Sequence, residues 1–216
     1  MNLLHRQNIK LVIFDFDGTI ADTSIGILDA HCFALSAMGK AIPEDEELRD
    51  IIGGNLLNTY ISRFGLDKLS ARKAVEIYRE RYAKIGIHKA TLYPNFLEIL
   101  KELKSRGYKI AIATLKAEAF AKIMVCELGI EKYFDKVCGM DVDDTLNKEQ
   151  LVIKCCELCN TSKEQAVLIG DSTSDLIGAN QSSVNFIGVT YGFGFKPNRK
   201  YNFTTVNDPI EILKVL

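Results

Sequence analysis

Apolar residues follow two different rhythms along the chain. Between residues 22 and 89 they recur every three or four positions, the spacing of amphipathic helices, and no strand pattern interrupts them. An apolar series that Gly39 closes predicts the first of these helices. Its members are Ile25, Leu28, Cys32, Leu35 and Met38.

Three further helices are predicted in the same segment. One begins at Pro43, ahead of a run of acidic residues that suits a first helical turn, and breaks at Gly53–Gly54. The next spans residues 55–64. The last is expected to take Ser70 as its cap and to stop at Gly86.

Strands and helices alternate through the rest of the chain. The expected strands are a run ending before Asp15 and residues 110–113, 136–139, 167–169 and 186–189. The expected helices lie before Gly107, over residues 117–128, around the cysteines at 155–159, before Ser182 and after Pro209, with a capping box at Thr161–Glu164.

This alternation implies an α/β fold with a doubly wound parallel sheet, in which ligands bind at the carboxyl ends of the strands. The helical segment is then an insertion after the first strand. We therefore predict a core of residues 1–21 and 90–216 and an inserted helical domain of residues 22–89.

Composition narrows the class of partner. The chain has 216 residues, 47% of them hydrophobic, which is ample for a core. Its net charge of -1 gives no electrostatic case for nucleic acid or an anionic membrane as the main partner. No membrane span or secretory signal is predicted, so we expect a cytoplasmic protein that acts on a small molecule.

Some groups that often carry chemistry are assigned packing roles. The spacing of Cys156 and Cys159 matches redox and zinc sites, but with Cys155 they fit the interior of an amphipathic helix and are expected to be reduced and packed. The three histidines are isolated in the sequence. The segment Tyr191–Phe195, glycines between aromatic residues, is interpreted as a turn with packed rings and is assigned no task.

The most informative motif ends the first strand. Asp15 and Asp17 lie one residue apart, so in an extended segment their side chains share a face. Two carboxylates this close repel by roughly 4 kcal/mol near a protein surface, which favours a bound cation or a raised pKa. Gly18 permits a sharp turn, and the hydroxyl of Thr19 can tie that turn or cap the segment after it. The alternative is a solvated strand end.

Other predicted strand ends add groups suited to phosphate chemistry. Thr114 offers a hydroxyl, and Lys148 a positive charge at the start of a helix. Asp171 and Asp175 follow another strand and its glycine. Oxygen ligands of this kind suit Mg2+. Each residue taken alone also fits a plain strand end, a solvated lysine or a helix cap.

Taken together, these motifs resemble the haloacid dehalogenase-like hydrolase superfamily over nearly the whole chain. The pair in Asp-Phe-Asp-Gly-Thr-Ile looks like its first motif, Thr114 its second, Lys148 its third, and Gly170 to Asp175 its fourth. The helical insertion is similar to that family's small cap on a Rossmann-like core. Segments such as Leu92-Tyr93-Pro94 look closest to phosphoglycolate phosphatase-like members, including nucleotidases. Leu115 departs from the asparagine that relatives often carry there.

The resemblance implies a Mg2+-dependent phosphatase. Asp15 is then the nucleophile that forms an aspartyl-phosphate, and Asp17 the general acid and base. Mg2+ is held by Asp15, the carbonyl of Asp17 and Asp171, and Asp175 supports the site by orienting either Lys148 or a metal-bound water. Thr114 and Lys148 bind the phosphoryl oxygens.

The inserted helical domain is expected to close over the site and choose the substrate. The candidates for its contact loop are Gly53, Gly54 and Asn55. Four arginines in this domain could bind an anionic group of the substrate; the alternative is that they lie solvated on helix faces. They are Arg49, Arg63, Arg79 and Arg81.

Competing functions stay open at this point. Asp17 argues against dehalogenation, because a halide leaves without a proton whereas an alkoxide needs one. A phosphosugar mutase of the same superfamily keeps the same residues. A receiver-like module that carries a stable phospho-aspartate is a different class, against which the insertion and the length argue. A binding protein without catalysis is a further alternative.

Overall fold

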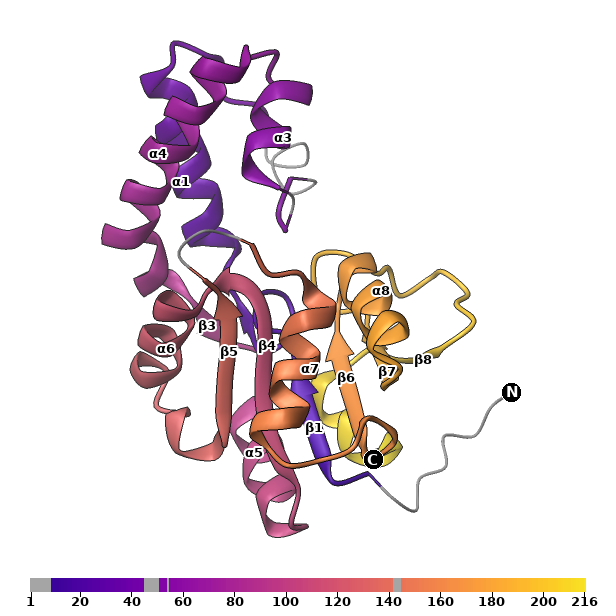
Figure 1. Cartoon of the computed structure of the whole chain (residues 1–216). Helices are drawn as coiled ribbons and strands as arrows, with labels where there is room; N and C mark the ends of the chain where they lie inside the picture. Colours follow the sequence, from indigo (N-terminus) through magenta and orange to yellow (C-terminus); the bar gives the residue numbers. More distant parts are fainter. Residues whose placement is uncertain (1–8, 45–50, 54, 142–144) are drawn as a thin grey trace. The chain divides into compact units, whose positions relative to one another are not determined.

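The computed structural model describes residues 9–44, 51–53, 55–141 and 145–216. They form two compact units, drawn in Figure 1. The core unit comprises Met1–Asp22 and Leu92–Leu216, and the helical unit comprises Thr23–Thr91.

The core unit is built on a parallel sheet of six strands in the order β5-β4-β1-β6-β7-β8. Its strands are β1 (Leu11–Phe14), β4 (Lys109–Ala117), β5 (Lys136–Met140), β6 (Ala166–Gly170), β7 (Asn185–Val189) and β8 (Thr204–Val206). From the central β1 the order grows through β4 and β5 on one side and through β6, β7 and β8 on the other. This confirms the doubly wound α/β fold and makes β1 the point where the direction of winding reverses, the usual place for a ligand site.

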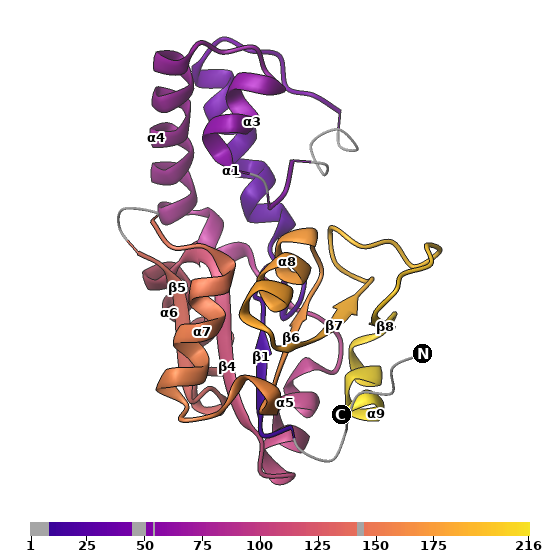
Figure 2. The same ribbon diagram turned by 45° about the vertical axis from the view of Figure 1, so that its right-hand side comes forward.

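Helices cover both faces of this sheet, which explains why β1 is apolar at every position and fully buried. On one face, Leu11 and Ile13 join a cluster with residues of α7 and α8. On the other, Phe14 packs edge-on against Phe96 of α5 with ring centroids 5.4 Å apart. Figure 2 shows α7 and α8 in front of the strands and α5 behind them. The helices of this unit are α5 (Phe96–Ser105), α6 (Glu118–Glu127), α7 (Lys148–Leu158), α8 (Thr173–Ser182) and α9 (Ile212–Val215).

The helical unit contains α1 (Ser24–Ala37), α3 (Leu56–Ser62), α4 (Lys68–Lys84) and the short 3-10 helix η2 (Gly86–Lys89). Its interior includes a buried polar contact, in which His31 Nδ1 lies 3.1 Å from the hydroxyl of Tyr60. Arg81 pairs with Asp29 at 2.8 Å, so this arginine is engaged within its own unit. The helix expected from Pro43 falls largely on residues 45–50, outside the described residues.

Two predicted caps are wrong. Asp67, not Ser70, caps α4, because its carboxylate accepts hydrogen bonds from the N–H groups of Leu69 and Ser70. No capping box forms at Thr161–Glu164, where a 3-10 helix begins after Ser162 without a side-chain cap. Capping boxes form instead at the starts of α7 and α8.

Several short elements were not expected. The strand predicted over residues 110–113, reaching Thr114, continues to Ala117, with a register shift against β5 after Ala113. A small sheet pairs β2 (Ala21–Asp22) with β3 (Thr91–Leu92), and β8 extends the main sheet. Further 3-10 helices are η3 (Glu131–Tyr133), η4 (Lys163–Gln165) and η5 (Pro209–Glu211). Among the described residues, no helix has the length and apolar character needed to span a bilayer.

The cysteines at 155–159 lie in the interior of the core unit. Cys155 and Cys156 on α7, and Cys159 just after it, are buried and unbonded, and they pack in the apolar cluster against the sheet. Burial raises the pKa of Cys156 to about 11, which keeps its thiol protonated and unreactive at neutral pH.

Candidate active site

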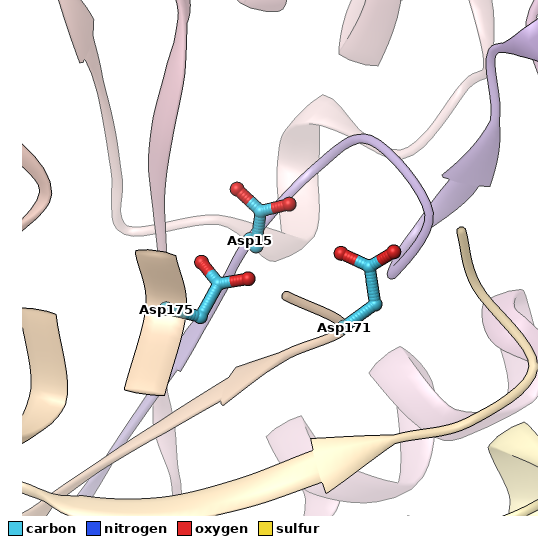
Figure 3. Close-up of side chains that lie close together, drawn as sticks. All are labelled: Asp15, Asp171 and Asp175. Carbon is cyan, nitrogen blue, oxygen red and sulfur yellow. The ribbon is translucent and has the colours of Figure 1, made fainter. Parts of the chain in front are cut away.

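Three buried carboxylates meet at the carboxyl edge of the core sheet. Asp15 directly follows β1, and its N–H donates to Ile169 of β6 at 2.8 Å, which fixes the end of one strand against the other. Asp171 follows β6, and Asp175 lies in the first turn of α8. One carboxylate oxygen from each of the three residues lies within 4.8 Å of the other two. Figure 3 shows the three side chains close together.

Lys148 supplies the positive charge within this group. Its Nζ lies 2.5 Å from Asp15 Oδ1 and 2.6 Å from Asp175 Oδ1, and it also donates to the carbonyl of Ala113 at 2.7 Å. The lysine is 5% exposed, so its long side chain needs space inside the protein. Gly178 of α8 leaves that space, because a Cβ there would lie 2.5 Å from Lys148 Cγ.

Local helix geometry orients Asp175. It is the third residue of α8 and completes the capping box that begins at Ser172, since its Oδ2 accepts hydrogen bonds from the N–H and the hydroxyl of Ser172 at 3.0 and 2.5 Å. Its other oxygen faces Lys148. Both oxygens of Asp175 are therefore engaged, and the carboxylate holds the lysine in place.

Burial and mutual repulsion shift the pKa values of the other two carboxylates. Desolvation raises the pKa of Asp15 well above its usual value, and although Lys148 opposes this shift, the neighbouring carboxylates add to it. Desolvation and Asp175 raise the pKa of Asp171 to about 7. Burial alone lowers the pKa of Lys148, but the two carboxylates it contacts more than compensate and hold it above its usual value. Ionising all three carboxylates would thus place more negative charge in the cluster than one lysine balances, which is why the site favours either bound protons or a cation.

Thr114 and Asp17 lie at the same edge of the sheet. Thr114 is on β4, the neighbour of β1, and its Oγ1 accepts a hydrogen bond from the N–H of Lys116 at 3.1 Å, which leaves its hydroxyl proton free to be donated. Lys116 Nζ lies 3.1 Å from Asp17 Oδ1, and the lysine side chain is only 6% exposed.

Comparison with known proteins identifies the family. A family model described as haloacid dehalogenase-like hydrolase matches residues 12–189. The chain belongs to this family. It is 33% identical to a 5'-nucleotidase from Pseudomonas aeruginosa over 85% of this chain and 83% of the relative. It is 29% identical to a phosphoglycolate phosphatase from Psychrobacter arcticus over 94% of each chain.

A solved structure and a further relative are also similar to this chain. A solved haloacid dehalogenase-like hydrolase from Streptococcus pneumoniae has a TM-score of 0.87 at 30% identity, covering 95% of this chain and 97% of that one. A protein described as tyrosine-protein kinase PtkA from Mycobacterium tuberculosis is 30% identical over 87% of this chain and 64% of the relative. The chain is thus an enzyme of the haloacid dehalogenase-like hydrolase family, with phosphatases among its relatives.

The structure brings together most of the residues singled out in the sequence. The four strand-end motifs of this haloacid dehalogenase-like hydrolase converge on one edge of the sheet, although they are up to 160 residues apart. Gly18 has a positive φ of 79° and lies so close to Asp171 that a Cβ would overlap the carboxylate. Thr19 is buried, and its hydroxyl has no hydrogen-bond partner in the described part of the chain.

The cap-loop candidates belong to the helical unit and stay predictions. Gly53 has a positive φ of 81°, and Asn55 caps α3 by accepting a hydrogen bond from the N–H of Asn58 at 3.0 Å. Gly54 and Arg49 lie outside the described residues.

Sequence reasoning missed Lys116. A signal for it was present, because side chains two apart on an extended strand share a face, and Lys116 lies two residues beyond Thr114. The expectation that the strand stops at Thr114 hid this relation.

Two oxygens of the cluster are available to a cation. Asp15 Oδ2 and Asp171 Oδ1 accept no hydrogen bond from any described residue, whereas their partner oxygens are engaged by Lys148 and by backbone N–H groups. These oxygens belong to two buried carboxyl groups whose pKa values are raised by burial and mutual repulsion. Such a pair fits a hard divalent cation, which prefers oxygen ligands.

Proposed function

We propose that this enzyme is a Mg2+-dependent phosphatase that hydrolyses a small phosphomonoester through a phosphoryl group carried on Asp15. The observation that carries the proposal is the buried group of Asp15, Asp171, Asp175 and Lys148 at the carboxyl edge of the sheet. Phosphatases among the relatives support the same reaction class.

Asp15 and Asp17 have separate tasks in this proposal. A carboxylate oxygen of Asp15 attacks phosphorus as the bond to the leaving oxygen breaks, and Asp17 gives its proton to that oxygen. Asp17 then takes a proton from a water molecule, whose oxygen attacks phosphorus and releases inorganic phosphate and the free Asp15 carboxylate. Asp15 lies at the site where two neighbouring strands and a lysine converge, which suits a nucleophile held in place.

Lys148 and Thr114 bind the transferred group. Lys148 is held by Asp175, so it retains a fixed partner when an incoming phosphoryl group draws it from Asp15. The free hydroxyl proton of Thr114 is a second donor at the same edge. Donors that are already oriented stabilise the charge of the transition state without reorganisation.

Asp15 and Asp171 would hold Mg2+ through their free oxygens, with the main-chain carbonyl of Asp17 as the third protein ligand that the family resemblance implies. The ion supplies positive charge that offsets the repulsion between an anionic nucleophile and a phosphate dianion. Two or three protein ligands leave positions for water and substrate, as Mg2+ usually requires.

The substrate class is a small phosphorylated metabolite. The named activities of the relatives point to nucleoside monophosphates and phosphoglycolate as the first compounds to test. Gly53, Gly54 and Asn55 are proposed to help select among them.

A panel of phosphate esters, assayed for released phosphate with Mg2+ and again with a chelator, tests the proposal. We expect hydrolysis that needs Mg2+ and that Asp15→Asn abolishes. Asp67→Asn is the matched control, because this exposed aspartate caps α4 and asparagine caps as well. Full activity in the Asp15→Asn enzyme would refute the assignment of the nucleophile.

The Asp17→Asn variant separates the two half-reactions. The leaving group of p-nitrophenyl phosphate needs no proton, so this variant is expected to transfer the phosphoryl group to Asp15 but to hydrolyse the resulting aspartyl-phosphate slowly. The phosphoryl-enzyme should then accumulate and be detected by mass spectrometry after an acid quench. Isomerisation of a sugar phosphate without released phosphate would indicate a mutase. A stable phospho-aspartate in the wild type would indicate a signalling module, and transfer to a tyrosine peptide would indicate a kinase.

A further inference from the structure

The glycine-rich loop after β7 contacts Asp171 through its backbone. The N–H groups of Phe193 and Gly194 donate to Asp171 Oδ2 at 2.6 and 3.2 Å. The next N–H, that of Phe195, donates to the main-chain carbonyl of Asp171 at 2.7 Å. Three consecutive N–H groups thus converge on one residue.

Glycine is required for this approach on steric grounds. A Cβ at Gly194 would lie 2.5 Å from the carbonyl oxygen of Asp171. A Cβ at Gly192 would lie 2.6 Å from the Cβ of Asp171 and would also overlap the carbonyl oxygen of Gly18. The loop therefore packs directly on both Asp171 and the turn that follows Asp15.

Aromatic residues anchor the loop at both ends. Tyr191 donates its hydroxyl to the carbonyl of Thr19 at 3.0 Å, and its ring packs against Tyr93 with centroids 4.8 Å apart. At the other end, Phe195 is buried and packs against Phe186 and Tyr201. These contacts fix the position of the three N–H groups relative to the sheet.

The donors to Asp171 differ in kind from those to the other carboxylates. Asp15 and Asp175 are paired with a cation, Lys148, whereas one oxygen of Asp171 is held by neutral N–H groups. A neutral donor fixes the carboxylate's orientation and leaves its charge available to a bound cation. The backbone N–H groups occupy Oδ2, which leaves Oδ1 of this residue for the Mg2+ that we propose the acidic cluster binds.

We propose that the loop Tyr191–Phe195 is a positioning element for Mg2+ binding, which holds Asp171 with one oxygen on the backbone and the other directed to the ion. This inference rests on the proposed function. Groups that orient a metal ligand typically contribute about 10- to 100-fold to metal affinity. The loop carries no ionisable catalytic group of its own, so its effect is exerted through Asp171.

Calorimetric titration of the whole protein with Mg2+, without substrate, tests this role. We expect Gly194→Ala to weaken Mg2+ binding by about 10- to 100-fold, and to regain its turnover rate when Mg2+ is raised to saturation. Tyr191→Phe removes one anchoring hydrogen bond and adds no bulk, so we expect it to fold and to show a smaller loss of Mg2+ affinity in the same direction.

Gly107→Ala is the matched control. Gly107 has a positive φ of 85° at the end of α5, nothing lies within 4 Å of its would-be Cβ, and it precedes β4 at the opposite edge of the sheet. The change costs roughly 1 kcal/mol of stability and should leave Mg2+ affinity unchanged. If the wild type binds Mg2+ and both Gly194→Ala and Tyr191→Phe bind it equally well, the proposed role of the loop is wrong, whereas the proposed function still stands. A wild type that binds no Mg2+ would overturn the proposed function, and this inference with it.

Discussion

Replacing Lys148 by methionine tests the electrostatic balance of the site. Methionine keeps an unbranched side chain of similar length but removes the ammonium group that lies 2.5 Å from Asp15 and 2.6 Å from Asp175. Each contact amounts to roughly 6 kcal/mol of gross attraction at an effective dielectric constant of about 20. Most of that attraction is offset by the desolvation of the charges. The net cost of removing one partner from a buried ion pair is about 3–5 kcal/mol.

We therefore expect Lys148→Met to lower the free energy of unfolding by about 3–5 kcal/mol in metal-free buffer at pH 7.5, measured by urea denaturation. The loss should shrink as the pH falls. Without Lys148, the pKa of Asp15 rises further above its unfolded value, so protonation stabilises the folded variant more than the wild type.

Lys154→Met is the matched control on the same helix. Lys154 pairs with Glu118 at 3.2 Å, but its side chain is 43% exposed, and an exposed pair contributes about 0–1 kcal/mol. If Lys148→Met destabilises the protein no more than Lys154→Met does, the assignment of Lys148 as the charge that holds two buried carboxylates together is wrong.

Two further outcomes are expected from the site. Burial raises the folded pKa of Asp171 to about 7, above its ordinary value of 3.8. With respect to this group the metal-free protein should therefore be most stable below about pH 4 and should lose on the order of 4 kcal/mol as the pH rises from about 4 to about 7. Urea unfolding with a chelator measures this loss. Saturating Mg2+ or Asp171→Asn should make the pH dependence of stability shallower, leaving the part that is due to Asp15. An equally steep profile in Asp171→Asn would contradict the contribution of Asp171. Lys116→Met removes the buried partner of Asp17 and should lower kcat/KM by up to about 100-fold. The control, Lys122→Met, breaks an exposed ion pair on α6 and should leave kcat/KM unchanged. Equal kcat/KM values in the two variants would exclude a role for Lys116.

Local features of the structure were readable from the sequence. Strand and helix periodicity depends on backbone geometry over a few residues, so β1, the cysteine-bearing α7 and the glycine that ends α1 were predicted where they occur. The strand-end carboxylates were also recognisable, because parallel strands deliver their carboxyl ends to one edge of a sheet. Caps were less certain: Asp67 and Ser70 both favour a helix start, and the chain uses the one whose carboxylate reaches two N–H groups.

Contacts between distant segments required the tertiary structure. No local pattern specifies that Lys148 reaches Asp15 across 133 positions, or that it is Asp175 that holds the lysine. The glycine loop is the clearest case. Its sequence predicts only a turn, because the task of Phe193 and Gly194 is performed by backbone N–H groups that every residue but proline possesses. Their position next to Asp171 makes them specific, and packing of the strands and aromatic anchors decides that position.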